Sequence, residues 1–371
     1  MKQRFTAIFV KLIIMILAVF TVQLHADYID DYILDQMQKQ NIPGLTLGII
    51  KNGKIVKIKA YGLASIELDV PATTETVYQL ASTTKSFTIC SIQKLYEEGK
   101  LDLNDKISKF LPDLPKAWEN ITIQHCISHS SGLPDFFENS WTVPEENTRR
   151  EVLNKVFKKE LVNKPGEKIA YNQTGYLLLG MIIEKISNMS FEDFLQSKFF
   201  GPLEMTSTKF GDYREIIKGR ASMYTRIESF NEGNIIISED KIYTTYGNAY
   251  IYKPYLHPCA GLNSTINDLI KWNLALDSDL LFREETKEKM WNVELNDKNS
   301  LKLSDKMSMS NGWFVYNHPE YNGIGISGGT SNGYWRFLDE RLTVILLTNC
   351  QAIDPNGIIM QLAELYRKEN L

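Results

Sequence analysis

Strand-like patterns stand at both ends of this sequence, and a long helical stretch separates them. Residues 45–50 read LTLGII and precede Asn52-Gly53, the strongest short signal for a hairpin turn. Residues 54–61 then alternate in the manner of a return strand, and residues 342–347 read LTVILL near the other end. Strands from both ends of a chain can complete one antiparallel sheet, so we expect the middle to form a helical lobe.

The fold class predicted from this layout is α/β of the α+β type. An antiparallel sheet is flanked by helices and carries a large helical insert lobe. We expect one domain over 27–371, its sheet lobe from about 27–99 and 311–371 and its helical lobe over about 100–310. Helical patterns cover 27–40, 82–98, 176–186, 267–276 and 358–368, and further strands are expected at 312–316, 323–327 and 333–338. Residues 220–258 are polar, aromatic and irregular, and we interpret them as long surface loops.

The first 26 residues have the organisation of a secretory signal peptide. Lys2 and Arg4 precede an apolar run over residues 5–22, and Ala26 provides a small residue before the expected cleavage. A membrane anchor is the alternative, but Lys11 divides the run and leaves the rest short for a span. We therefore expect an exported protein, periplasmic or secreted, with no stable membrane anchor after cleavage.

Charge and cysteine usage exclude several classes of function. Lys and Arg number 41 against 45 Asp and Glu, and no basic stripe is present, so nucleic-acid binding is not expected. The four cysteines form no CxxC pair, which disfavours a zinc site. An exported chain can form a disulfide, but we favour buried free thiols. No cofactor is expected, and the oligomeric state stays open.

Ser82-Thr83-Thr84-Lys85 is the first pattern that carries chemistry, an S-x-x-K. Residues three apart share one face of a helix, which places Lys85 one turn inside a helix that begins at Ser82. A serine hydroxyl needs an adjacent base to act as a nucleophile, and a lysine among apolar side chains can serve as that base. The pattern by itself is weak, because a capping serine and an unrelated lysine produce it by chance.

The surrounding blocks are more specific. Residues 77–88 resemble the first motif of class C β-lactamases and related penicillin-binding proteins. Further blocks resemble that family in the same order along the chain: 95–105, 121–134, 165–180, 201–206 and 260–272. The resemblance extends over about 30–365. It implies a β-lactamase/transpeptidase-like fold and a serine hydrolase in which Ser82 is acylated and its N–H is an oxyanion donor.

The resemblance also implies roles for residues in two later blocks. Tyr171-Asn172-Gln173 aligns with the family's Tyr-x-Asn, which implies that Tyr171 is the proton-transfer partner. Gln173 departs from the pattern at the substrate-positioning site, where it is one methylene longer than Asn. Ile326-Ser327-Gly328-Gly329 matches the third block, in which the Gly329 N–H would be the second oxyanion donor. Ile326 replaces the family's usual cation, so we expect weak activity on substrates that present a carboxylate there. Arg336 on the next strand is a possible substitute charge.

The resemblance leaves two functions open. The first is hydrolysis of amide or ester bonds through an acyl-enzyme, with a small-molecule or peptidoglycan-type substrate. The second is a degenerate penicillin-binding-like protein that binds without turnover, suggested by Gln173 and Ile326. His125 and His129 are spaced i, i+4, but no third ligand accompanies them, and we expect no metal site.

Overall fold

The computed structural model describes residues 28–137, 148–211, 216–231, 234–239, 241–244, 253–291, 300–302, 306–318 and 321–370. The predicted signal peptide, residues 1–26, lies outside these residues.

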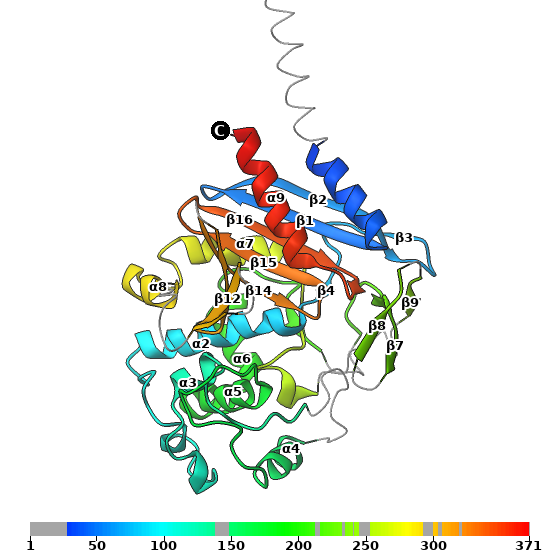
Figure 1. Cartoon of the computed structure of the whole chain (residues 1–371). Coiled ribbons are helices and arrows are strands. Elements are labelled where there is room, and N and C mark those ends of the chain that lie inside the picture. Colours follow the sequence, from blue (N-terminus) through cyan, green and yellow to red (C-terminus); the bar gives the residue numbers. More distant parts are fainter. Residues whose placement is uncertain are drawn as a thin grey trace, which may run out of the picture.

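Among the described residues, a nine-stranded sheet forms the centre of the fold, in the order β11-β12-β13-β14-β15-β16-β1-β2-β3. The first and last parts of the chain meet in it, because β1 pairs antiparallel with β16 and places Leu47 opposite Leu346 (Figure 1). This pairing confirms that strands from both chain ends complete one sheet. The strands are β1 (Gly44–Lys51), β2 (Lys54–Ser65), β3 (Val70–Pro71), β11 (Ser300–Lys302), β12 (Met307–Ser310), β13 (Trp313–Asn317), β14 (Asn322–Gly328), β15 (Asn332–Phe337) and β16 (Leu342–Thr348).

The hairpin between β1 and β2 follows the predicted turn chemistry. Asn52 has φ 51° and Gly53 has φ 71°, so both residues lie in the left-handed region that a two-residue type I′ turn requires. Asn and Gly adopt this conformation at low cost, which explains why this dipeptide forms the turn between the two strands.

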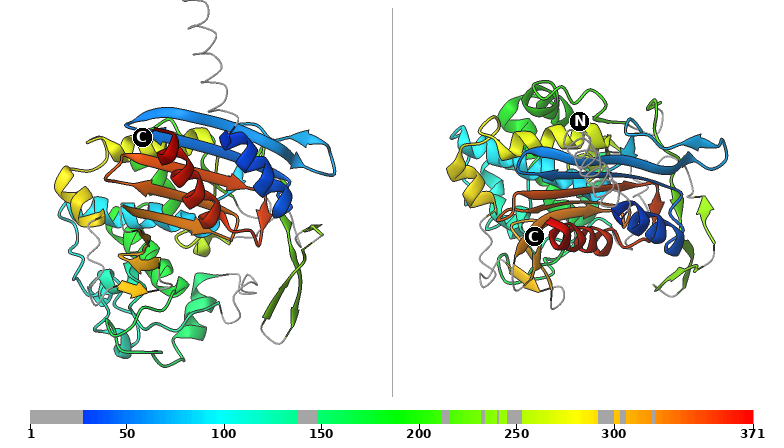
Figure 2. Two further views of the ribbon diagram at one scale, coloured as in Figure 1. Left: turned by 45° about the horizontal axis from the view of Figure 1, so that its top comes forward. Right: turned by 90° about the horizontal axis from the view of Figure 1, so that it is seen from above.

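Helices cover both faces of the sheet. Figure 2 shows α9 (Pro355–Asn370) and the helix over residues 28–39 side by side on one face, and α7 (Ile266–Asp277) on the other. Gly48 of β1 allows α7 to approach, since a Cβ there would lie 3.1 Å from the Ile266 side chain. One apolar core lies under α9, and a second, larger core joins the opposite face of the sheet to the helical lobe.

The helical lobe is built around α2 (Lys85–Glu97) and α5 (Gln173–Ser187), which pack against each other. Shorter helices surround them: α3 (Ile123–Ile127), α4 (Arg149–Val156), α6 (Phe191–Leu195) and α8 (Glu284–Trp291). Helix α2 is buried along most of its length, as its many apolar residues indicated. The α+β fold with an antiparallel sheet and a helical lobe is confirmed.

Two local expectations differ from the structure. The interpretation of residues 220–258 as loops is wrong for part of that segment, which contains the short strands β6 (Tyr224–Thr225), β7 (Ile227–Asn231), β8 (Asn234–Ile237) and β9 (Tyr243–Thr244). Strands β11 and β12 precede residue 311, where we expected the strand pattern to resume. Strands this short show few alternations, so they are harder to distinguish from loops in the sequence.

The four cysteines, Cys90, Cys126, Cys259 and Cys350, are buried and free. This confirms buried thiols rather than disulfides. Within the described ranges, no helix combines the length and apolar character needed to cross a membrane.

Candidate active site

Ser82 lies on a short 3-10 turn, η1 (Ala81–Thr84), that leads directly into α2. Ala81 has φ 46°, a left-handed conformation that is unfavourable for a residue with a Cβ. Such strain persists where surrounding contacts hold it, and here the Leu80 N–H donates to the Leu262 carbonyl at 2.8 Å. Ser82 is therefore presented, partly exposed, on a sharp bend ahead of the helix proper, which begins at Lys85 rather than at Ser82.

Lys85 is the first residue of α2, and only 1% of its surface is exposed. Its ammonium donates to the Ser82 hydroxyl at 3.4 Å and to the Cys259 carbonyl at 2.8 Å. The contact with Ser82 arises from the i, i+3 spacing on one helical turn. The contact with Cys259 joins α2 to the segment before β10 (Leu262–Ser264).

Tyr171 lies just before α5 and is 43% exposed. The Lys85 Nζ lies 4.9 Å from the centre of its ring and 5.4 Å from the centre of the Tyr176 ring. A cation at this distance is attracted by the faces of both rings. The structure therefore brings Ser82, Lys85 and Tyr171 into one group, although Tyr171 is almost ninety positions away in the chain.

The start of α5 is held by polar contacts that position the residues after Tyr171. Asn172 caps the helix, since its side-chain oxygen accepts from the Gly175 N–H at 2.8 Å. Gln173 is the first helical residue, and its backbone N–H donates to the Asp135 carboxylate at 3.0 Å. Burial raises the pKa of this Asp135 carboxyl above its usual value.

Strand β14 lies against the Ser82 turn, and glycine makes that approach possible. A Cβ on Gly328 would lie 2.1 Å from the Leu80 carbonyl oxygen and 2.8 Å from the Ser82 nitrogen. Gly329 follows at φ 60°, at the turn out of the strand. Ser327 points to the opposite face of the sheet, where its hydroxyl accepts from the Asn356 amide at 3.4 Å.

Ile326 and Arg336 lie on the same face of the sheet as Gly328, the face that is turned toward Ser82. Neither residue provides an unpaired positive charge there. Ile326 is 3% exposed and belongs to the larger apolar core. Arg336 is 4% exposed, forms an ion pair with Asp277 at the end of α7, and stacks over the Trp291 ring at 4.1 Å. The Arg336 guanidinium, which we considered as a substitute for the missing cation, is therefore paired with Asp277 between β15 and α7.

The two histidines have separate surroundings. His125 is part of the capping box of α3, where its Nδ1 accepts from the Thr122 N–H. His129 is buried between the rings of Tyr171 and Tyr176. Burial, with a contribution from the Lys85 charge, lowers the pKa of His129 to about 3. Among the described residues, no cluster of three or more metal-ligating side chains occurs.

Three contributors to the site were missed by reasoning from sequence: the Cys259 carbonyl, the Asp135 carboxylate and the His129 ring. His129 lies within the block 121–134 that resembles the family, and Asp135 directly follows it, so nearness to this block was the only signal in the sequence. The Cys259 contribution is a backbone group and has no signature in sequence.

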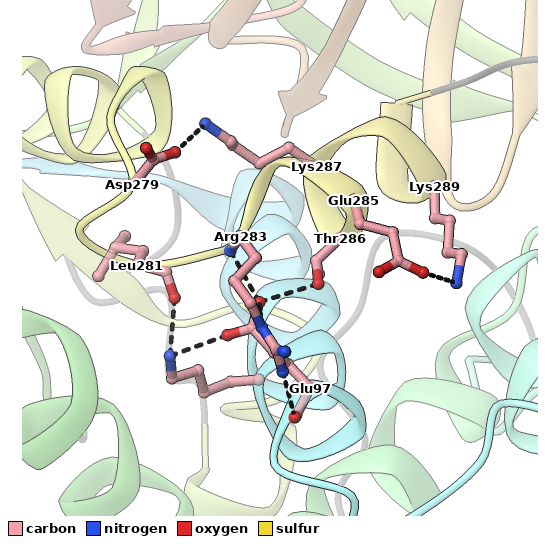
Figure 3. A network of polar contacts seen from close by, with 9 residues as sticks. Glu97, Asp279, Leu281, Arg283, Glu285, Thr286, Lys287 and Lys289 are labelled. Carbon is pink, nitrogen blue, oxygen red and sulfur yellow. Dashed lines mark hydrogen bonds and ion pairs between the residues drawn. The ribbon is translucent and has the colours of Figure 1, made fainter.

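A surface hollow of about 520 Å³ lies away from Ser82, at the end of α2 near residues 96–109 and α8. Figure 3 shows its polar network: the Glu97 carboxylate accepts from the Arg283 N–H at 2.7 Å and the Thr286 hydroxyl at 2.9 Å, and it pairs with Lys94. Lys289 pairs with Glu285 on the same helix. The bonds from Glu97 to Arg283 and Thr286 link the end of α2 to the start of α8.

A family model described as Beta-lactamase matches residues 29–364. Protein flp of Staphylococcus aureus (strain NCTC 8325 / PS 47) is 37% identical over 187 residues, covering 49% of this chain and 38% of that protein. The match therefore spans less than half of the length of Protein flp. Penicillin-binding protein 4* of Bacillus subtilis (strain 168) is 29% identical over 327 residues, covering 84% of this chain and 69% of that protein.

Solved structures show the same fold. The octameric penicillin-binding protein homologue from Pyrococcus abyssi has a TM-score of 0.76 at 27% identity, covering 92% of this chain and 77% of its own. The D-amino acid amidase from Ochrobactrum anthropi SV3 has a TM-score of 0.73 at 20% identity, covering 92% and 100%. The hydrolase EstCE1 has a TM-score of 0.75 at 17% identity, covering 93% and 99%. The last two likenesses establish the fold alone.

Proposed function

Since the chain belongs to the beta-lactamase family of serine hydrolases, we propose that it cleaves amide or ester bonds through an acyl-enzyme on Ser82. The observation that carries the proposal is the contact between the Lys85 ammonium and the Ser82 hydroxyl at 3.4 Å, inside a buried and aromatic setting. Nucleophilic catalysis requires a serine with an adjacent base, a role that we assign to Tyr171 beside the Lys85 ammonium.

The roles follow from where the groups lie. The Ser82 oxygen attacks the substrate carbonyl while its proton passes to the phenolate oxygen of Tyr171, whose negative charge the neighbouring Lys85 ammonium stabilises. The same proton then goes to the leaving amine or alcohol, which departs and leaves an ester on Ser82. Water attacks this ester in the second half of the reaction, and the acid product and free serine are regenerated.

Charge on the carbonyl oxygen in the intermediate is stabilised by the N–H groups of Ser82 and Gly329. The close approach of β14 to the turn at Gly328 supports this assignment, because it brings the backbone after Gly328 beside Ser82. Loss of one such donor typically reduces the rate by about 10²–10³-fold. Gln173, at the start of α5, is the residue we expect to position the substrate.

The substrate class is narrowed by what surrounds Ile326. A carboxylate next to Ile326 would meet an apolar side chain packed in the core, and Arg336 is engaged with Asp277. Leaving a carboxylate unpaired in such a setting is unfavourable. We therefore expect esters and amides without that carboxylate to be preferred among small-molecule and peptidoglycan-type substrates.

Export is part of the proposal. The pattern of residues 1–26 supports a signal peptide. N-terminal sequencing of the protein recovered outside the cytoplasm tests it: a start at Asp27 supports cleavage and release, whereas a start at Met1 favours a retained anchor.

A second candidate function is binding without turnover. The buried Ile326, where the family usually has a cation, is the specific observation that favours it. Both functions place the ligand at Ser82, and they differ in whether a covalent adduct forms and is hydrolysed.

The decisive experiment uses the full chain and its Ser82→Ala variant. Each is incubated with a fluorophosphonate probe and then with a fluorescent penicillin, and the labelled residue is identified by mass spectrometry. Labelling by the phosphonate that disappears in Ser82→Ala supports the acyl-enzyme, and additional penicillin labelling points to cell-wall or β-lactam chemistry. Folded protein that reacts with neither reagent would favour binding without turnover.

The narrower claim about Ile326 needs its own measurement. Hydrolysis of nitrocefin, which carries the carboxylate, is compared with hydrolysis of p-nitrophenyl acetate, which does not. We expect turnover of the ester to exceed that of nitrocefin. Nitrocefin turnover comparable to that of an efficient β-lactamase would refute the preference.

A further inference from the structure

His129 has an unusual position for a residue outside the proposed reaction. Its side chain is enclosed, and its ring centre lies 4.4 Å from that of Tyr171 and 4.9 Å from that of Tyr176. Its backbone has φ 58°, in the left-handed region that residues with a Cβ rarely adopt. Strain of this kind is found where surrounding contacts impose a specific geometry, often at functional sites.

The backbone on both sides of Tyr171 is bonded to the same histidine. The Ala170 N–H donates to the His129 carbonyl at 2.8 Å, and the Asn172 N–H donates to the His129 Nδ1 at 3.0 Å. With the ring contact, three interactions from one residue surround Tyr171. None of these three contacts involves the hydroxyl of Tyr171, so they do not compete with its proposed role in proton transfer.

The charge of the imidazole is determined by its surroundings. Because Nδ1 accepts a hydrogen bond, the neutral ring carries its proton on Nε2. Lys85 of α2 and the two tyrosines around α5 are the titratable groups at the ring, and a second positive charge beside Lys85 is unfavourable. Burial and the Lys85 charge keep the pKa of His129 near 3. His129 is therefore the neutral member of this cluster at neutral pH.

Packing alone does not account for a histidine here. Among the described residues, its buried Nε2 has no hydrogen-bond partner. An unsatisfied buried donor costs about 1–3 kcal/mol. A phenyl ring would fill similar space without that donor, but it could not accept from the Asn172 N–H. An asparagine could accept that bond but could not stack. Neutral imidazole is the side chain that stacks as a ring and accepts in the ring plane.

We propose that His129 is a positioning residue that holds Tyr171 against the Lys85 ammonium, through its ring stack and through the two peptide groups that flank Tyr171. This inference rests on the proposed function, because it assigns His129 to the same proton-transfer group. Only 1% of the His129 surface is exposed, so the residue is not placed to touch a substrate, and we expect its effect to be on the rate of the chemical step.

The test compares His129→Asn and His129→Phe, alone and combined with Tyr171→Phe, using p-nitrophenyl acetate and the fluorophosphonate probe on the full chain. Asn keeps the acceptor and Phe keeps the ring, so each removes one of the two side-chain interactions. We expect kcat to fall by roughly 10–100-fold in each single variant, with KM changed by less than about threefold, since small misplacements of reacting groups are costly. Leu362→Ala, in the core under α9, provides a destabilised control remote from the site.

The combined variants separate positioning from general damage. If His129 acts through Tyr171, then His129→Asn has little further effect once Tyr171 is Phe. Equal losses in both backgrounds, or full kcat in both single variants, would overturn the inference. A wild-type protein with neither turnover nor Ser82 labelling would remove the proposed function and this inference with it, whereas an active wild type with unaffected His129 variants removes the inference alone. Exchange of the Asn172 amide, expected to be faster in His129→Phe than in His129→Asn, checks the bond without relying on activity.

Discussion

The Lys85 ammonium donates to the carbonyl of Cys259, 174 positions later in the chain, at 2.8 Å. This bond joins the first residue of α2 to the segment before β10. It also fixes the side chain that contacts Ser82. The Cys259 thiol in turn donates to the Gln173 carbonyl at 3.2 Å, so one residue links α2 to the start of α5.

Replacing Lys85 with methionine tests whether its charge serves chemistry. Methionine fills a similar volume, so we expect the protein to remain folded while kcat/KM on p-nitrophenyl acetate falls by about 10²–10⁴-fold. Lys94→Met is a matched control, because Lys94 is on the same helix and donates to the Leu281 carbonyl at 2.7 Å. Comparable activity in Lys85→Met and Lys94→Met would argue against a role for Lys85.

Gly328→Ala tests the approach of β14 to the Ser82 turn. The added Cβ would overlap the Leu80 carbonyl oxygen, so the strand or the turn must shift. We expect phosphonate labelling to slow by about 10²–10³-fold, the typical effect of losing an oxyanion donor. Stability, measured by urea unfolding, should fall by about 1–3 kcal/mol.

Gly48→Ala is the control for this substitution. Gly48 lies in the same sheet, and the nearest atom to an added Cβ is the end of the Ile266 side chain at 3.1 Å, which can move. Its effect on labelling should be small. If both variants label equally fast, β14 does not set the geometry at Ser82.

The buried His129 predicts a pH dependence of stability. The pKa of His129 is lowered to about 3 in the folded protein from an ordinary value of 6.5, so the unfolded chain binds one more proton between these values. The stability that comes from keeping this residue neutral is present above pH 6.5 and is lost as the pH falls toward 3, by up to roughly 1.4 kcal/mol per unit. Urea unfolding at pH 7.5 and pH 4.5 measures the loss, which should be smaller in His129→Asn. An unchanged difference between the two pH values in that variant would contradict the prediction.

Glu97 predicts an effect on stability without an effect on chemistry. Its carboxylate accepts from Arg283 and Thr286 (Figure 3) and from Lys94. Glu97 is the last residue of α2, whereas Ser82 lies ahead of the first. Glu97→Gln should lower the free energy of unfolding by about 1.5–3 kcal/mol, the usual contribution of hydrogen bonds to a charged group, with kcat/KM unchanged.

Glu285→Gln is the comparison for Glu97. The Glu285 side chain is 77% exposed and pairs with Lys289 at 2.8 Å. Exposed pairs contribute less than about 1 kcal/mol, so this change should be nearly neutral. Equal losses at the two positions would show that Glu97 does not fasten α8 to α2.

The parts of the fold that depend on local chemistry were predictable from the chain itself. The turn at Asn52-Gly53 requires two left-handed residues, and those residue types adopt that conformation readily. The contact between Ser82 and Lys85 follows from a spacing of three along a helical turn. The strands at 45–50 and 342–347 were long and apolar enough to recognise, and their location at the two chain ends predicted that they share a sheet.

Only the tertiary structure decided the contacts between residues distant in the chain. It alone pairs Arg336 with Asp277, brings the Cys259 carbonyl to Lys85, and places His129 between Tyr171 and Tyr176. These contacts depend on the relative placement of whole elements, and that placement results from packing many side chains into a common core. A residue's own neighbours in sequence carry little information about such packing, whereas turns and helix spacings are set within a few residues.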